Sequence, residues 1–458
     1  MKKLLLTLTA ITGFLNAFSW GNDVLVHSEP VGRPSLVATS NGTLYCSVPS
    51  GISGQRGINI LQSTDLGATW SLVTNLSNGQ LVAKSKLVVT GTDSVYCAYQ
   101  QGSSLYFYSL QSHTRSSYTI RQISDFDVAA SPNSNSLYLF TDESGTDFLY
   151  YNSSTDGGHT WTGTSGNVSV NAAQPRVSMD GDRLILNYFG PPLTPVTTSD
   201  IRTMVFDETA PGTIQSGGFF PMVSAGLERS MFASCKVNDN VWFVYTEGDT
   251  LTELKYRLST LNGSSYGPET SITGGGTTSI GCFDITSYKN QNDSGMYVVY
   301  FSQTTSGQAE MKFLSVSSAT PTVFSSPETF NDFTPECTDD DTYPAVTSIL
   351  QDAGVVFFER DAGVASLYYD ILTTTLKTPE IENEQLLSLF PNPVQSELSI
   401  QIKNPDLESL CRITDITGRV LKVVELQENI TTVDLSDFVS GIYFLDLEGR
   451  EVSRFIKE

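Results

Sequence analysis

Seven stretches of this chain share one pattern, and this repetition constrains the fold more than any other feature. Each stretch has a polar turn followed by alternating apolar residues around a bulky anchor. The anchors are Tyr45, Tyr96, Tyr138, Ile185, Trp242, Tyr297 and Val355, spaced between 42 and 58 residues apart. An apolar run precedes each anchor run, another follows it, and most units add a weaker fourth. A period of about 40 to 60 residues holding four strands is typical of a propeller blade, so the sequence predicts an all-β fold with a seven-bladed β-propeller.

The seventh unit lacks an obvious fourth strand before the composition changes after Leu376. Residues 23–28 (DVLVHS) form a spare strand near the start of the chain. We predict that this strand joins the seventh blade and closes the ring, because closure removes two exposed sheet edges. The propeller is expected to span residues 20–377.

Both ends of the chain differ from the repeats. Lys2 and Lys3 precede an apolar stretch and small residues at 17 and 19, which predicts a signal peptide over residues 1–19. No later apolar run reaches the roughly 18 residues of a membrane-spanning helix, so no membrane span is expected. Residues 378–385 (TPEIENEQ) are acidic and lack aromatics, as a linker does, and residues 386–458 alternate like a small β-sandwich.

Composition limits the chemistry. The 458 residues carry a net charge of −23, which argues against nucleic acid or an anionic membrane as a partner. Only three histidines and six cysteines without C-x-x-C spacing are present, which leaves little for a zinc site or a Ser-His-Asp triad. The pairing of the cysteines does not follow from the sequence. No cofactor or metal is expected, except that Asp339, Asp340 and Asp341 form either a Ca²⁺-binding loop or a solvated one.

The tail contains an ordered series of short motifs. Phe390-Pro391-Asn392-Pro393 opens it, a turn with Gly418 follows, then Ser440-Gly441-Ile442-Tyr443, and a basic, apolar end. This series resembles the type A C-terminal sorting domain of the bacterial type IX secretion system. The resemblance implies the secretion machinery as a partner, and export through the periplasm of a Gram-negative bacterium to the medium or the cell surface. The Asn392 and Gly418 turns are also what any tight hairpin needs.

Two segments, Ser63–Trp70 (STDLGATW) and Ser154–Trp161 (STDGGHTW), share the pattern S-T-D-x-G-x-T-W, and residues 259–266 (STLNGSSY) are a degraded copy. In such a turn Asp accepts backbone N–H groups, Gly adopts positive φ and Trp fills the space beneath. A catalytic carboxylate would not be repeated around a ring and then lost, so we predict a structural role. The positions concerned are Ser63, Asp65, Gly67 and Trp70, and Ser154, Asp156, Gly158 and Trp161. These turns resemble the Asp-box, or bacterial neuraminidase repeat, of sialidases and of other propellers, some of which are not enzymes.

Three arginines, Arg33, Arg176 and Arg229, open first strands, which line the axis of a propeller. They form either an anion site or ordinary rim charges. A sialidase grips its substrate carboxylate with three arginines. Here, however, alignment on Pro34 places Gly32 where that family has its first arginine.

We therefore predict binding of an extracellular glycan or protein at the channel mouth, by Arg33, Arg176, Arg229 and Tyr343. A sialidase-like exo-glycoside hydrolase that uses the arginine cluster is the alternative. No catalytic residue is assigned.

Overall fold

In a computed structural model of the protein, the described residues run from Ser19 to Glu458. The gaps are 52–55, 77–78, 80–81, 83, 119–121, 144–145, 147, 163–165, 171, 191–199, 224–230, 247–252, 274–277, 291–292, 305, 338–342, 351, 362–363, 374–386, 403–408, 416–418, 427–429 and 448–450. All regular elements among the described residues are strands. They fall into two compact units, one within residues 18–374 and one within residues 375–458, and each is described by itself.

The larger unit contains seven antiparallel sheets; six have four strands in sequence order, and the seventh has six strands drawn from both ends of the unit. The first three blades comprise β3 (Ser35–Ala38), β4 (Leu44–Ser50), β5 (Gly57–Ser63) and β6 (Ser71–Leu76); β7 (Lys84–Val89), β8 (Val95–Gln101), β9 (Ser104–Ser109) and β10 (Thr114–Tyr118); and β11 (Ile123–Ala130), β12 (Leu137–Glu143), β13 (Phe148–Ser154) and β14 (Gly166–Val170). The next three comprise β15 (Ala173–Asp180), β16 (Arg183–Gly190), β17 (Asp200–Ala210) and β18 (Thr213–Val223); β19 (Phe232–Val237), β20 (Asn240–Thr246), β21 (Leu254–Ser259) and β22 (Thr270–Ser271); and β23 (Thr278–Lys289), β24 (Ser294–Thr304), β25 (Ala309–Ser317) and β26 (Glu328–Thr329).

The seventh blade is built from both ends of the unit. It contains β28 (Ala345–Ile349), β29 (Asp352–Asp361) and β30 (Val364–Thr373), with the short β27 (Thr334–Pro335) beside β29. Its outer strand is β2 (Val24–Ser28), which pairs antiparallel with β30, and β1 (Ser19–Trp20) pairs further along the same strand. The predicted ring closure is confirmed. Ser19, the last residue assigned to the signal peptide, pairs with Thr373; residues 1–18 lie outside the described residues.

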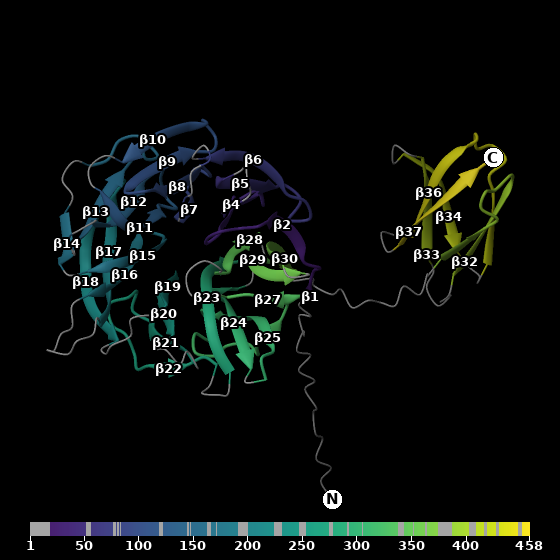
Figure 1. The fold of residues 1–458 in the computed structure, drawn as a ribbon. Helices are drawn as coiled ribbons and strands as arrows, with labels where there is room; N and C mark the ends of the chain where they lie inside the picture. Colours follow the sequence, from purple (N-terminus) through teal and green to yellow (C-terminus); the bar gives the residue numbers. More distant parts are fainter. Residues whose placement is uncertain are drawn as a thin grey trace, which may run out of the picture. The chain divides into compact units, whose positions relative to one another are not determined.

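The first strands of successive blades lie next to one another around the ring, from β3 and β7 through β28 and back to β3 (Figure 1). The seven-bladed β-propeller is therefore confirmed. The anchor strands are buried because each blade packs its faces on its neighbours: Tyr96 and Phe107 of the second blade share a core with Phe126 and Leu139 of the third. Each large side chain buried in this way contributes about 1.5–3 kcal/mol.

The tail unit has two sheets that share one core. The first contains β31 (Leu387–Phe390), β32 (Glu397–Ile402) and β35 (Ile430–Asp434); the second contains β33 (Ser409–Thr414), β34 (Val420–Leu426), β36 (Gly441–Leu447) and β37 (Glu451–Lys457). Leu398 and Ile400 of the first sheet pack with Leu445 and Phe455 of the second, as expected for a small β-sandwich.

Two motif residues of the tail tie its chain together. The Asn392 side chain, between Pro391 and Pro393, accepts the Ile456 N–H at 2.9 Å and donates to the Arg454 carbonyl at 3.2 Å. The Tyr443 hydroxyl donates to the Val439 carbonyl at 2.7 Å, two residues before Gly441 begins β36. Gly418 and the predicted linker, residues 378–385, lie outside the described residues.

Candidate binding site at the channel mouth

The S-T-D-x-G-x-T-W turns use their polar side chains on themselves. In the first blade the Asp65 carboxylate accepts the Thr69 N–H at 2.9 Å, the Thr69 hydroxyl at 2.6 Å and the Ser63 hydroxyl at 2.7 Å. Asp156, Thr160 and Ser154 of the third blade repeat these three bonds at the same distances. An Asp whose oxygens are engaged in this way holds a turn, and it has little capacity left to act on a substrate.

The degraded turn in the fifth blade retains only part of this network. The Ser259 hydroxyl still accepts the Gly263 N–H, at 3.0 Å, as Ser63 and Ser154 accept those of Gly67 and Gly158 at 2.8 Å. Leu261 stands where the other turns have Asp and supplies no acceptor. The backbone path therefore persists after the carboxylate is lost, as expected for a structural turn.

The tryptophans of these turns pack on cores that their own blade shares with the preceding blade. The centre of the Trp161 ring lies 4.6 Å from that of Phe107 and 5.9 Å from that of Tyr118, and both of these residues are in the second blade. The centre of the Trp70 ring lies 5.4 Å from that of Tyr369, in β30 of the seventh blade. The turns thus contribute to the packing between blades. A ligand-binding site is expected instead where the first strands begin. We call that end of the ring axis the channel mouth.

Three charged side chains from consecutive first strands meet at the mouth. Lys84 of β7 lies 2.5 Å from Asp125 of β11, and Asp125 lies 3.2 Å from Arg176 of β15. Burial opposes the charge of Lys84 and lowers its pKa to about 8, although Asp125 counteracts this. Burial would also raise the pKa of Asp125, but Lys84 and Arg176 outweigh it and lower the pKa to about 2. Asp125 is therefore ionised near neutral pH and holds two cations at the mouth.

Arg33 and Tyr343 stack on each other beside this row. The Arg33 guanidinium carbon lies 3.6 Å from the centre of the Tyr343 ring, and both residues are half-buried. Arg33 lies two residues before β3 and Tyr343 lies two residues before β28, each with a proline between, so the adjacent first and seventh blades supply the pair. Burial opposes the charge of Arg176, but Asp125, Asp127 and, least of the named causes, Tyr343 raise its pKa above the usual value. Tyr343 thus acts electrostatically on Arg176 from a blade three positions away.

A second level of charges lies further along the first strands. Lys86 is 3.8 Å from Asp127, and Asp127 also accepts the Val177 N–H at 2.8 Å. On the far side of the ring, Asp284 of β23 accepts the Val346 N–H at 2.9 Å. Burial raises the pKa of Asp284 to about 6; Lys86 lowers it, and Asp127 raises it. Asp284 therefore responds to charges from the opposite blades, and its pKa lies close to neutral pH.

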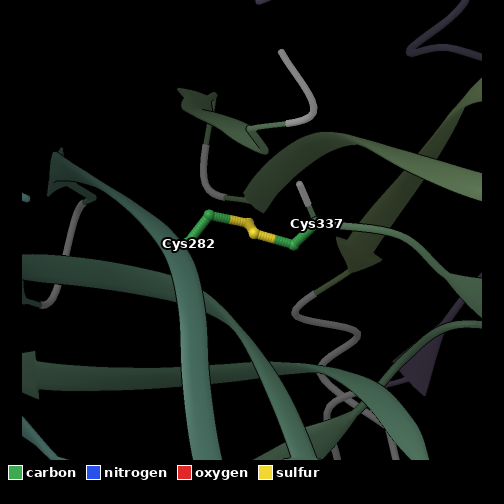
Figure 2. The surroundings of a disulfide bond; sticks show 2 residues. All are labelled: Cys282 and Cys337. Atoms are coloured by element: carbon green, nitrogen blue, oxygen red, sulfur yellow. A yellow bond between two sulfur atoms is a disulfide. The ribbon is translucent and has the colours of Figure 1, made fainter. Parts of the chain in front are cut away.

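The described residues contain one disulfide, between two neighbouring blades. Cys282 of β23 and Cys337, just after β27, are bonded with their Cα atoms 6.1 Å apart (Figure 2). The bond joins the sixth blade to the segment that enters the seventh blade at the mouth. The remaining cysteines, Cys46, Cys97, Cys235 and Cys411, are buried free thiols.

Of the predicted site residues, the structure brings Arg33, Arg176 and Tyr343 to one end of the ring. Arg229 and the run Asp339, Asp340 and Asp341 lie outside the described residues. Sequence reasoning missed Lys84, Asp125 and Asp284. These residues are charged side chains within first strands whose other residues alternate apolar side chains. That break in the pattern is the sequence signal that indicates them.

Comparison with known proteins identifies the tail. Residues 388–457 match the family model of the secretion system C-terminal sorting domain. The tail is a type IX sorting domain. The protein is therefore secreted, or carried to the outer surface, by a Gram-negative bacterium, and this confirms the predicted export. No helix among the described residues is long and apolar enough to cross a membrane.

The propeller is similar in fold to several solved structures. A protein of unknown function from Dyadobacter fermentans has 12% identity and a TM-score of 0.47, with 78% of this chain and 98% of that chain covered. The Penicillium chrysogenum alpha-L-arabinanase has 14% identity and a TM-score of 0.43, with 78% and 99% covered. The NanB sialidase from Streptococcus pneumoniae has 12% identity and a TM-score of 0.41, with 77% and 71% covered. No curated protein sequence is significantly similar to this chain. None of these likenesses is close enough to transfer an activity.

Proposed function

We propose that the exported propeller binds an extracellular glycan or protein that presents an anionic group at the channel mouth. The observation that carries the proposal is the stack of Arg33 on Tyr343, with Arg176 across the axis. An arginine placed on an aromatic ring has lost part of its freedom before a ligand arrives, which lowers the cost of binding. Its fork of N–H donors suits carboxylate and sulfate groups.

The local charge supports an anionic ligand. Among the described residues, Arg33, Lys84 and Arg176 bring three positive charges to the mouth, and Asp125 lies between two of them. Lys86 and Asp127 of the second level offset each other. The whole chain, by contrast, carries a net charge of −23. A local excess of positive charge in an acidic protein steers anions to one place. Arg229 is proposed as a further member of this site.

The test is a glycan array of sialylated, uronic-acid and neutral glycans, probed with the intact secreted chain. Arg33→Ala should weaken binding of the captured glycan at least tenfold, which corresponds to about 1.4 kcal/mol. Arg115→Ala is the matched control, because Arg115 also lies over a tyrosine ring, that of Tyr106, but on the outer strand β10. Equal affinities of the Arg33 and Arg115 variants would place the ligand elsewhere.

A glycoside hydrolase is the second candidate, and Asp284 is the observation that favours it. A carboxyl with a pKa near 6 can donate a proton at neutral pH, whereas Asp125, with a pKa near 2, stays ionised. Carboxyls whose pKa values are pushed apart are typical of glycosidase acid and base roles. Hydrolysis of a fluorogenic sialoside that Asp284→Asn reduces by more than 100-fold, with binding retained, would establish the enzyme. Binding without turnover would leave the binding function alone.

A further inference from the structure

Four carboxyl groups gather where the N-terminal strands close the ring. Asp23 lies between β1 and β2, Asp332 lies between β26 and β27, Glu359 is in β29 and Asp370 is in β30. Asp23 and Asp332 each accept a hydrogen bond from the backbone of the other. The Asp332 N–H donates to Asp23 Oδ2 at 2.6 Å, and the Asp23 N–H donates to Asp332 Oδ2 at 3.2 Å. The chain that closes the ring is thus fastened through side chains as well as through strand pairing.

Backbone donors satisfy one oxygen of each carboxyl on the seventh blade. Glu359 Oε1 accepts the Phe333 N–H at 3.2 Å. Asp370 Oδ1 accepts the N–H groups of Gly21 and Ile371 at 2.9 and 2.7 Å. Gly21 belongs to the closing segment, so Asp370 also holds that segment in place.

The other oxygens are buried without a partner. Asp23 Oδ1, Glu359 Oε2 and Asp370 Oδ2 accept no hydrogen bond. Glu359 is 0% exposed and Asp370 is 1% exposed. None of the ion pairs in the described part of the chain involves these carboxyls. Buried carboxylates without cations or donors are costly, whereas a protonated carboxyl becomes a donor to its neighbour.

We propose that Asp23 and Glu359 share a proton, and that this proton fastens the closing segment to the seventh blade, so that ring closure weakens as the pH rises. The adjacent residues Asp332 and Phe333 donate their N–H groups to Asp23 and Glu359, which brings the two carboxyls together, and each carboxyl has one buried oxygen left for a shared proton. Each of the two side chains also affects the pKa of the other. The described residues contain no group of three His, Cys, Asp or Glu arranged to hold a metal ion, which favours a proton over a divalent cation. This device acts on the fold and is independent of the proposed ligand site.

The sign of the pH dependence follows from the surroundings. Burial raises the pKa of Glu359, and the charge of Asp23 raises it further. Burial likewise raises the pKa of Asp23, and it raises that of Asp370 to about 7. A carboxyl whose pKa is higher in the folded state stabilises closure fully below its ordinary pKa, near 4. That stabilisation is lost as the pH rises through the raised values.

One group on the closing strand acts in the opposite direction. Burial lowers the pKa of His27 in β2, so acid favours the open strand in which His27 can take up a proton. Asp332 adds a negative charge that disfavours ionisation of both Asp23 and Asp370. The carboxyl contribution is therefore measured by comparing variants, not from the wild-type pH profile alone.

Hydrogen exchange of the intact chain tests the proposal. We expect the protection factors of the β2 amides, which are corrected for intrinsic exchange, to fall by up to about tenfold per pH unit between about pH 5 and pH 8. Glu359→Gln should flatten this dependence, because an amide donates to Asp23 at every pH. Asp23→Asn should do the same and serves as the second variant if the first folds poorly. Asp182→Asn removes an exposed carboxyl in the turn after β15 and should leave the dependence unchanged.

Two outcomes would overturn the proposal. One is a wild-type dependence that neither Glu359→Gln nor Asp23→Asn alters, or no wild-type dependence at all. The other is that added Ca²⁺ restores β2 protection at pH 8 in the wild type but not in Glu359→Gln. In that case the cluster holds a cation and not a proton.

Discussion

The same eight-residue turn packs at two different interfaces between blades in this propeller. In the third blade it contacts the second blade, its neighbour along the chain, and we call this the internal seam. In the first blade it contacts the seventh, where the two ends of the ring meet, and we call this the closing seam. The hydrogen bonds inside the two turns agree within 0.1 Å, since Asp65 and Asp156 make their bonds to Thr at the same distances. The turn is therefore an autonomous unit, and what differs is the surface that it meets.

Among the described residues, the turn at the internal seam has polar contacts that the turn at the closing seam lacks. At the internal seam the Ser116 hydroxyl donates to the Gly158 carbonyl, and Thr114 bonds His159 at 3.2 Å. At the closing seam Gly67 lies on the Tyr369 ring, and neither the Tyr369 hydroxyl nor the Trp70 indole N–H has a partner. The closing seam depends on close packing and on the N-terminal strand, so it should tolerate added volume less well.

The largest effect should come from adding a methyl group to the glycine of each turn. A Cβ on Gly67 would lie 1.8 Å from a ring carbon of Tyr369, whereas one on Gly158 would lie 3.0 Å from Phe107. Both glycines have positive φ, near +90°. We expect Gly67→Ala to destabilise the propeller by about 2–4 kcal/mol and Gly158→Ala by about 1–2 kcal/mol, measured as thermal midpoints.

Gly181→Ala is the control for the backbone contribution. Gly181 has φ of +62° and open space where a Cβ would lie, so its variant reports only the cost of positive φ. A Gly67→Ala midpoint no lower than that of Gly181→Ala would mean that Tyr369 moves aside without cost. The closing seam would then be no tighter than the internal one.

The blades themselves could be predicted because their signals are local. The alternation around anchors such as Tyr138 and Trp242 lies within a few residues of each strand, and residues 23–28 are the one apolar run outside the seven units and the tail that can complete the last blade. The sequence places Arg33 and Tyr343 together at the channel mouth, and the structure stacks them. Their role in ligand binding stays a prediction, as do those of Arg229 and Asp339–Asp341.

Contacts between blades could not be predicted in the same way. The pairing of Arg176 with Asp125 depends on the register between neighbouring first strands, which loops of unequal length conceal. The disulfide between Cys282 and Cys337 spans 55 residues and two blades, and nothing in the spacing selects it. Asp23 and Glu359 look like surface charges in the sequence, yet one oxygen of each is buried where the closing segment joins the seventh blade.

The next effect concerns pH, and here the two seams should diverge. Hydrogen bonds from Thr69 lower the pKa of Asp65 to about 2, and bonds from Thr160 outweigh burial and lower the pKa of Asp156. A carboxyl with a lowered folded pKa stabilises above its ordinary pKa, near 4, and this contribution is lost as the pH falls through about 2. Asp65→Asn and Asp156→Asn should each reduce the drop in thermal midpoint between about pH 5 and pH 2.

Only the closing seam should also weaken at high pH, through Asp23 and Glu359. Protection of β2 should therefore pass through a maximum with pH, while protection of β13, at the internal seam, should show the acid loss alone. If both strands gave the same profile in hydrogen exchange, the carboxyl cluster would have no local effect.

A smaller difference should appear when each tryptophan is replaced by phenylalanine. The Trp161 indole N–H donates to the Gly158 carbonyl at 3.1 Å, whereas that of Trp70 is buried without a partner. Trp161→Phe should therefore cost more than Trp70→Phe, by roughly 0.5–1.5 kcal/mol in the free energy of unfolding. Both variants lose similar ring area, so each serves as the control for the other. Equal losses would show that the bond at the internal seam adds nothing to its stability.

The smallest effect should be a gain. Leu66 occupies the turn at φ of +59°, where the third blade has Gly157 at +68°. A left-handed conformation costs a leucine about 1–2 kcal/mol, and the greater freedom of an unfolded glycine offsets about 0.5–1 kcal/mol of the relief. Leu66 is 38% exposed, so little apolar burial is lost on replacement. Leu66→Gly should therefore raise the thermal midpoint by about 1 °C or less. Asparagine tolerates the same φ without the added freedom of an unfolded glycine, so Leu66→Asn should raise the thermal midpoint at least as much. A lower midpoint in both variants would mean that the Leu66 side chain itself supports the closing seam.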